Sequence, residues 1–182
     1  MHKMRGCFAD DPSDSITWTI PLTEIMIMTE FSITTVDAQP YLYVERKSSM
    51  EPDEVGPAVG SGLQEVYAHM QGNGVPPAGS ALVLYTSNAD GVMDYNVGFE
   101  ISPEDMDKEH DQIKAGKTPA GKVLTHLHVG PYTNLRETYG AMMQHMESES
   151  LQWAGPCWEV YLNDPSSTAE ADLKTRIYIS IA

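Results

Sequence analysis

Lysine and arginine are scarce in this sequence. Its 182 residues include 11 of them against 26 aspartates and glutamates, which gives a formal charge of −15. Nucleic-acid-binding proteins need clustered cations to neutralise phosphates, so this charge excludes direct nucleic-acid binding. The same shortage argues against docking on an anionic membrane. A negative field instead attracts positively charged molecules, so we expect a small cationic ligand.

Cysteines and long apolar runs are also few. Cys7 and Cys157 lie 150 positions apart, which argues against a disulfide framework and against a metal or redox pair. No apolar run approaches the roughly 20 residues of a transmembrane helix. Aspartates near the N-terminus replace the basic flank of a signal peptide. We therefore expect a cytoplasmic protein that does not associate with a membrane.

Standard cofactor and metal motifs are missing. The sequence has no glycine-rich phosphate loop, no Gly-x-Ser-x-Gly nucleophile elbow and no zinc-hydrolase motif. His126 and His128 share one face of an expected strand, but no second pair of ligands lies at a recognisable spacing. We expect neither a cofactor nor a bound metal ion.

An internal repeat organises the chain. Residues 69–85 match residues 145–161 without a gap at a constant offset of 76 (145 − 69). Residues 99–102 match residues 177–180 at an offset of 78 (177 − 99), so only the intervening hairpin loop changes length. Such self-similarity predicts two copies of one supersecondary unit.

Each copy is expected to run strand, helix, strand, strand. Apolar residues recur at helical spacing in 55–70 and 135–146, whereas β-branched and aromatic residues fill the short runs around them. Two such units can bury their helices only against a shared sheet. This predicts an α+β fold, a tandem βαββ repeat with an antiparallel sheet and two helices on one face. The expected strands are 41–44, 81–85, 92–101, 122–129, 158–162 and 175–181.

The repeat also divides the chain into segments. Repeat one covers residues 31–102 and repeat two covers residues 121–182. The mostly charged residues 103–120 are expected to form a solvated linker, with a short helix starting at Pro103. Residues 1–30 belong to neither copy and form an N-terminal extension, for which a disordered lead-in and an extra edge strand remain alternatives.

Alternation along the expected strands sorts their side chains between the two faces of the sheet. Glu159 and Tyr161 share one face with Tyr85 of the first copy, and we expect this face to be free of helices. The set expected to meet the helices is Trp158, Val160 and Leu162, together with Leu82 and Leu84.

Glu159 is the most informative residue, because an acid within a β-rich, largely apolar run violates the usual composition of a strand. Its counterpart in the first copy is Val83, so the architecture does not require the acid. A carboxylate among Tyr85, Tyr132 and Tyr161 attracts a lipophilic cation, with cation–π attraction of roughly 0.5–2 kcal/mol per ring. Burial would also raise its pKa. The alternative is a solvent-facing strand glutamate.

Several short motifs point to a known family. They are Gly-Val-Pro-Pro-Ala-Gly at 74–79, Val-Gly-Phe at 97–99, His-Val-Gly-Pro-Tyr at 128–132, Trp-Glu-Val-Tyr-Leu-Asn-Asp-Pro at 158–165, and Thr175. Together they resemble the GyrI-like small-molecule-binding domains, which also occur as effector-binding domains of AraC-type and MerR-type regulators. The resemblance covers residues 31–182.

The resemblance implies a ligand groove between the two repeats, with Glu159 as the pocket glutamate. It also implies ligand-binding roles for Tyr132 and Tyr161. Trp158 falls in a family motif too, although alternation directs it away from Glu159. The sequence lacks a basic helix-turn-helix segment. We therefore expect a stand-alone effector-binding domain that binds small lipophilic, cationic or planar molecules, including several drugs, for sensing, sequestration or detoxification.

Two other functions remain open. In the first, the chain is a hydrolase of strained, cyclopropanoid electrophiles, as the resemblance implies for one subfamily, and Glu159 is its catalytic residue. In the second, the chain is a gyrase-inhibitor-like interaction module whose acidic surface contacts a basic protein such as gyrase, or a regulator. The sequence does not rank these two alternatives.

Overall fold

The computed structural model describes residues 31–182, so the extension expected at residues 1–30, with its two alternatives, lies outside the described residues. Within 31–182, no helix combines the length and apolar character needed to cross a membrane. The helices are α1 (Pro52–Gly72) and α2 (Leu135–Ser148), with short 3-10 helices η1 (Pro103–Lys108), η2 (Tyr132–Asn134) and η3 (Glu170–Asp172). The strands are β1 (Ser32–Val36), β2 (Pro40–Ser49), β3 (Ala81–Ala89), β4 (Val92–Glu100), β5 (Lys114–Lys117), β6 (Gly121–Val129), β7 (Trp153–Tyr161) and β8 (Lys174–Ile181).

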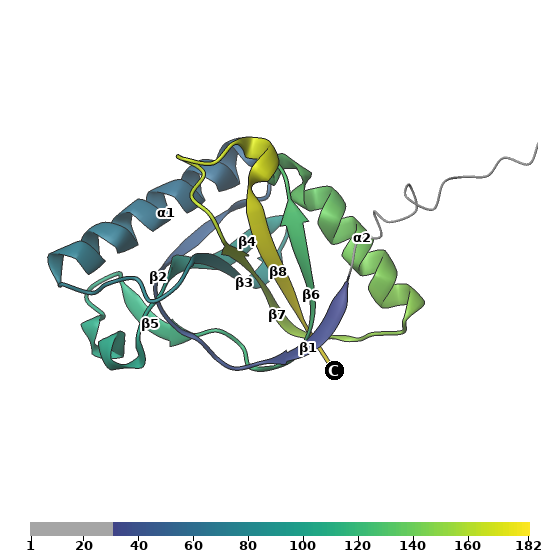
Figure 1. Ribbon diagram of the computed structural model, residues 1–182, viewed down its shortest axis with the longest axis horizontal. Helices are drawn as coiled ribbons and strands as arrows, with labels where there is room; N and C mark the ends of the chain where they lie inside the picture. The colour runs from purple at the N-terminus through teal and green to yellow at the C-terminus, as the bar shows by residue number, and fades with distance from the viewer. Residues whose placement is uncertain (1–30) are drawn as a thin grey trace, which may run out of the picture.

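The eight strands form one antiparallel sheet in the order β1-β6-β8-β7-β3-β4-β2-β5 (Figure 1). The order strand, helix, strand, strand occurs as β2-α1-β3-β4 and again as β6-α2-β7-β8. These two sets meet at the centre of the sheet, where β3 pairs with β7. The expected α+β fold with an antiparallel sheet is confirmed.

Short strands flank both sides of the sheet. β1 precedes β2 in the chain but pairs with β6, whereas β5 precedes β6 but pairs with β2. Residues 103–120, expected to be a solvated linker, therefore contribute a strand as well as the short helix that begins at Pro103. The sequence of β5, Lys-Ala-Gly-Lys, lacks the β-branched and aromatic residues typical of strands. Only its pairing with β2 reveals it.

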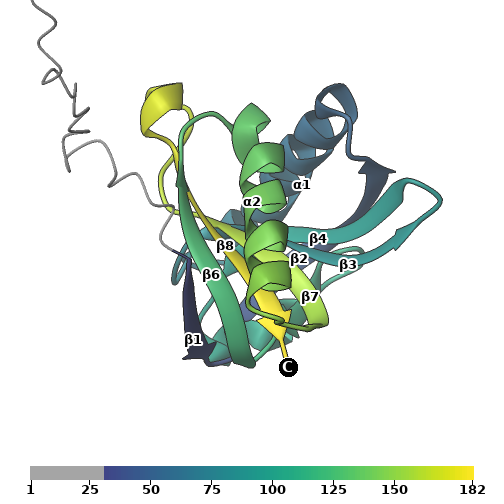
Figure 2. The ribbon, with the colours of Figure 1, turned by 90° about the vertical axis from the view of Figure 1, so that its right-hand side faces the viewer.

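Both helices cover the same face of the sheet (Figures 1 and 2). Val66 and Met70 of α1 and Met142 and Met146 of α2 belong to one buried cluster with the strands beneath them. The central strand residues of this cluster are Val83, Tyr85, Val97, Cys157, Ile177 and Ile179.

The expected assignment of the two sheet faces is wrong. Trp158 and Val160 lie on the face opposite the helices, in a separate buried cluster, and Leu162 lies beyond β7 with 45% of its surface exposed. Alternation grouped the side chains correctly, but both faces are apolar, so composition alone could not decide which face the helices cover. Glu159 therefore lies beneath the helices. The other buried members of the opposite cluster are Tyr41, Leu82, Leu84 and Val123.

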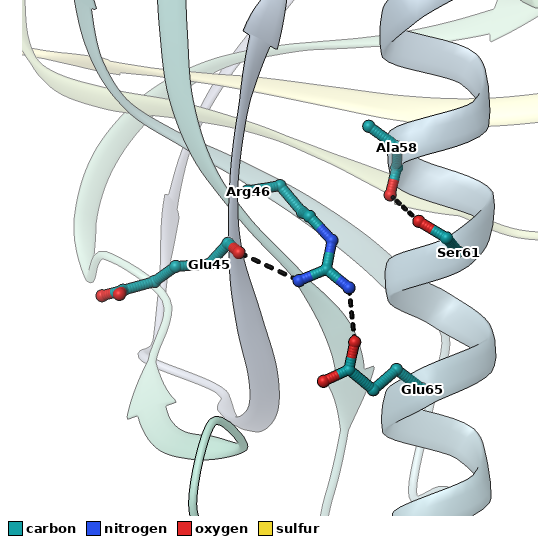
Figure 3. A network of polar contacts seen from close by, with 5 residues as sticks. All are labelled: Glu45, Arg46, Ala58, Ser61 and Glu65. Carbon is teal, nitrogen blue, oxygen red and sulfur yellow. Dashed lines mark hydrogen bonds and ion pairs between the residues drawn. The ribbon is translucent and has the colours of Figure 1, made fainter.

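An ion pair connects α1 to β2 (Figure 3). Nη2 of Arg46 lies 2.5 Å from Oε2 of Glu65, and Nη1 of Arg46 donates to the backbone carbonyl of Glu45 at 3.1 Å. Within the helix, the Ser61 hydroxyl donates to the backbone carbonyl of Ala58 at 3.0 Å. Because the ion pair is partly exposed, its contribution to stability is only about 0–1 kcal/mol.

Two glycines of α1 should respond differently to alanine substitution. A Cβ atom at Gly62 would lie 3.1 Å from Val97 and 3.3 Å from Val44, whereas a Cβ atom at Gly60 would meet nothing within 4 Å. We expect Gly60→Ala to stabilise the protein by about 0.5–1 kcal/mol, because alanine favours a helix interior. Gly62→Ala should gain less or destabilise it. Thermal unfolding measures both, and equal gains would contradict the close helix–sheet contact.

Candidate functional site

Glu159 lies on β7, where it pairs with Val83 of β3 and Ile177 of β8. Its carboxylate is on the helix-covered side, and only 2% of the residue is exposed. An ionised carboxylate at this depth is costly unless polar groups surround it. The alternative of a solvent-facing strand glutamate is therefore wrong.

Three tyrosine hydroxyls donate to the Glu159 carboxylate. Tyr161, two residues along β7 on the same face, donates to Oε2 at 2.8 Å. Tyr139 of α2 donates to Oε1 at 3.0 Å, and Tyr85 of β3 donates to the same oxygen at 3.2 Å. The site therefore joins both central strands of the sheet to α2.

The electrostatics of this cluster are set by burial. Burial raises the pKa of Glu159, and the hydrogen bonds from Tyr161, Tyr139 and Tyr85, followed by the charge of His128, offset part of the rise. Burial and then the negative charge of Glu159 raise the pKa of each of these three tyrosines well above its usual range. The hydroxyls therefore keep their protons and act as donors. Within residues 31–182, no lysine or arginine forms an ion pair with Glu159.

Tyr132 extends the cluster towards the surface. Its ring meets that of Tyr161 edge-on, with centroids 5.4 Å apart, and it is half-buried. The corner before it explains its position: Gly130 has a φ of 134°, which suits glycine, and its N–H donates to the carbonyl of Leu173 at 2.9 Å. Burial and the charge of Glu159 also raise the pKa of Tyr132. The structure thus brings Glu159, Tyr85, Tyr132 and Tyr161 together.

Three further polar residues belong to this region but were not expected as site residues. Tyr139 was expected only as part of the apolar stripe of its helix, and its contact with Glu159 follows once that face is placed under α2. Thr175 lies between Tyr161 and His128 across β7, β8 and β6. It is fully buried, and its hydroxyl has no partner among the described residues. His128 contacts Thr138 of α2 through Nδ1 at 2.8 Å.

Trp158 and Cys157 do not join the tyrosines at the carboxylate. Trp158 points to the opposite face, where its ring stacks on Tyr178 with centroids 4.8 Å apart. Cys157 shares the face of Glu159, but burial and the nearby negative charge raise the pKa of its thiol to about 12. A thiol with this pKa is protonated at neutral pH and is a poor nucleophile.

The chemistry available at the site is that of a buried carboxyl group among hydroxyl donors. It can balance the charge of a cation or hold a proton. Among the residues that the structure describes, no group of three or more His, Cys, Asp or Glu side chains is arranged to hold a metal ion.

Several solved structures share this fold. The EcmrR C-terminal domain matches with a TM-score of 0.66 and 20% identity, covering 85% of this chain and 98% of that one. A hydrolase encoded by lin2189 from Listeria innocua matches with a TM-score of 0.56 and 19% identity, covering 85% of this chain and 92% of that one. SAV2435 bound to tetraphenylphosphonium matches with a TM-score of 0.59 and 11% identity, covering 84% of this chain and 94% of that one. At these identities the likeness shows the fold alone.

Sequence comparison gives the family. No curated protein matches the chain. The family model of the GyrI-like small molecule binding domain matches residues 29–182, which include every residue of the Glu159 cluster. The chain therefore belongs to the family of GyrI-like small-molecule-binding domains.

Proposed function

We propose that this domain binds lipophilic organic cations at Glu159, as a sensor or a sequestering protein. The observation that carries the proposal is a carboxylate with 2% exposure for which residues 31–182 supply no lysine or arginine partner. A buried carboxylate without a lysine or arginine partner is costly, and a bound cation would reduce that cost. Part of the binding energy would therefore come from the attraction between the ligand and the buried carboxylate of Glu159.

The tyrosines around the carboxylate support an organic cation over a hydrated metal ion. Tyr85, Tyr132, Tyr139 and Tyr161 offer aromatic surface, and aromatic rings attract cations through their quadrupoles, by roughly 0.5–2 kcal/mol each. Rings also accept many planar shapes, which fits a site for several ligands. SAV2435, which shares the fold, is described as bound to tetraphenylphosphonium, a cation of this class.

Access to the carboxylate requires movement. Tyr132, Tyr139 and Tyr161 cover Glu159 and are themselves partly exposed, so they separate it from solvent. Tyr139 belongs to α2 and Tyr132 to the adjoining η2, whereas Tyr161 belongs to the central sheet. The ligand enters by displacing Tyr132 or Tyr139, because the strand residues are held by neighbours on both sides.

A matched pair of ligands tests the proposal. Methyltriphenylphosphonium and triphenylphosphine oxide have similar size and aromatic surface, but only the first is charged. We expect the phosphonium to bind at least about tenfold more tightly, because a charge-assisted contact is worth roughly 1.5–3 kcal/mol. Calorimetric titration of the full chain measures both affinities. Equal affinities would show a merely apolar site and would overturn the proposal.

A further inference from the structure

A cavity of about 230 Å³ lies on the face of the sheet that the helices leave uncovered. Trp158 and Val160 of β7 and Tyr178 of β8 line it from the sheet. The remaining lining residues come from the ends of β1 and β4 and from the segments that follow β1 and β5: Val36, Asp37, Gln39, Glu100 and Thr118. The cavity is thus separated from the Glu159 cluster by the sheet itself.

The rim of this cavity is held by reciprocal hydrogen bonds. The backbone N–H of Gln39 donates to Oγ1 of Thr118 at 2.9 Å, and the N–H of Thr118 donates to the carbonyl of Gln39 at 2.9 Å. Thr118 is buried although it lies between two strands, with only 4% of its surface exposed. These bonds join the segment that follows β1 to the segment that follows β5 at the rim.

Aromatic surface and negative charge meet in the cavity. Trp158 and Tyr178 are stacked with an angle of 12° between their planes. Oε2 of Glu100 accepts a hydrogen bond from the N–H of Ser80 at 2.9 Å, which fixes the carboxylate in place. Among the described residues, no lysine or arginine forms an ion pair with Glu100 or Asp37.

Two other polar side chains lie on this face of the sheet, Arg176 of β8 and Thr125 of β6. Arg176 is near enough to Tyr178 to lower its pKa, and Glu100 raises it, although burial has the largest effect and the net change is upward. Arg176 does not line the cavity, whereas Glu100 does. Thr125, which pairs with Tyr178 across the strands, is buried, and its hydroxyl has no partner among the described residues. This face of the sheet therefore carries a buried hydroxyl, that of Thr125, for which the described residues supply no hydrogen-bond partner.

We propose that this cavity binds a small organic ammonium ion, separately from the lipophilic cation at Glu159. Its volume lies below the roughly 300–1,000 Å³ of pockets for drug-sized ligands, so only a small ligand fits. Aromatic side chains combined with carboxylates are the usual means of binding quaternary ammonium groups. Trp158 and Glu159 are consecutive on β7, so the two cations would lie back to back across one strand.

Choline and its uncharged carbon isostere, 3,3-dimethylbutan-1-ol, test this proposal. The full chain is titrated with each, and the indole N–H of Trp158 is followed by NMR. We expect choline to bind at least about tenfold more tightly than the alcohol, because only choline gains the attraction of the carboxylates and rings. Equal affinities, or shifts confined to the tyrosines around Glu159, would overturn the proposal.

Matched variants separate this site from general electrostatics. Glu100→Gln should weaken choline binding about tenfold, because glutamine can still accept from Ser80 but has no charge. Asp37→Asn, at an exposed position that lines the cavity, should weaken it several-fold. Glu104→Gln removes one charge from exposed η1 and should leave the affinity unchanged. An equal loss in Glu104→Gln would refute a local site.

The same titration distinguishes the two proposed sites. Glu159→Gln should leave choline binding intact, because Glu159 faces the other side of the sheet. Loss of choline binding in that variant would place the ammonium ion at Glu159 and overturn the inference. Failure of the phosphonium to bind, with choline binding retained, would instead count only against the function proposed for Glu159.

Discussion

Glu159→Gln is expected to weaken the binding of methyltriphenylphosphonium by about 10- to 100-fold. The substitution preserves the shape of the side chain and removes its negative charge. Loss of a charge-assisted contact costs roughly 1.5–3 kcal/mol, which corresponds to that range of affinity. Because the carboxylate is buried, added salt should screen little of the effect in the wild type. Calorimetric titration at fixed ionic strength measures the change.

Two comparisons make this result specific to the carboxylate. Triphenylphosphine oxide, which is neutral, should bind the variant and the wild type equally well. Glu137→Gln, which removes one charge from the exposed side of α2, should not change the affinity for the phosphonium. If Glu137→Gln weakened binding as much as Glu159→Gln, the overall charge of the protein would be responsible, and the assignment of Glu159 would fail.

The same substitution is expected to stabilise the unliganded protein, increasingly so as the pH rises above 4.5. Burial raises the pKa of Glu159 in the folded state above its ordinary value of 4.5. The folded state therefore holds this proton more tightly than the unfolded state does. As the pH rises above 4.5, the unfolded chain loses the proton first, and the wild type loses stability until the folded pKa has been passed.

Urea unfolding between pH 4 and pH 8 measures this difference. The pH-dependent advantage of Glu159→Gln should be smallest at pH 4, below the ordinary pKa of 4.5, where Glu159 is mostly protonated in both the folded and the unfolded state. Glu137→Gln serves as the control, because its side chain is exposed and it should show no such pH-dependent gain. A stability difference between Glu159→Gln and the wild type that stays constant across this range would contradict a raised pKa.

The order of the elements could be predicted because it follows from local patterns. Helical spacing of apolar residues predicted α1 and α2, and runs of β-branched and aromatic residues predicted β3 and β4. The strand β5 could not be predicted, because its residues carry no strand preference and only the edge of β2 forms it. Nor could the covered face be predicted, since Trp158 and Ile177 are equally suited to burial.

For the candidate site, the sequence predicted which residues share a face of the sheet, but not which helix residues contact them. Glu159 stood out as an acid where the matching position holds Val83, and alternation placed Tyr85 and Tyr161 on its side. Tyr139 could not be added, because its position on α2 matters only once the helices are known to cover Glu159. The pairing of Thr175 with Tyr161 likewise depends on the register between β7 and β8.

The two edge strands, β1 and β5, connect the two halves of the sheet. β1 leads into the half that begins with β2 but pairs with β6 of the other half. Likewise, β5 leads into the half that begins with β6 but pairs with β2. Severing the halves would leave two open sheet edges, which are prone to wrong pairing. We therefore expect the two halves to fold and unfold as one unit. The strands β3 and β7 are paired on both sides, so in the proposed function the movement that admits a ligand falls to α2 and η2.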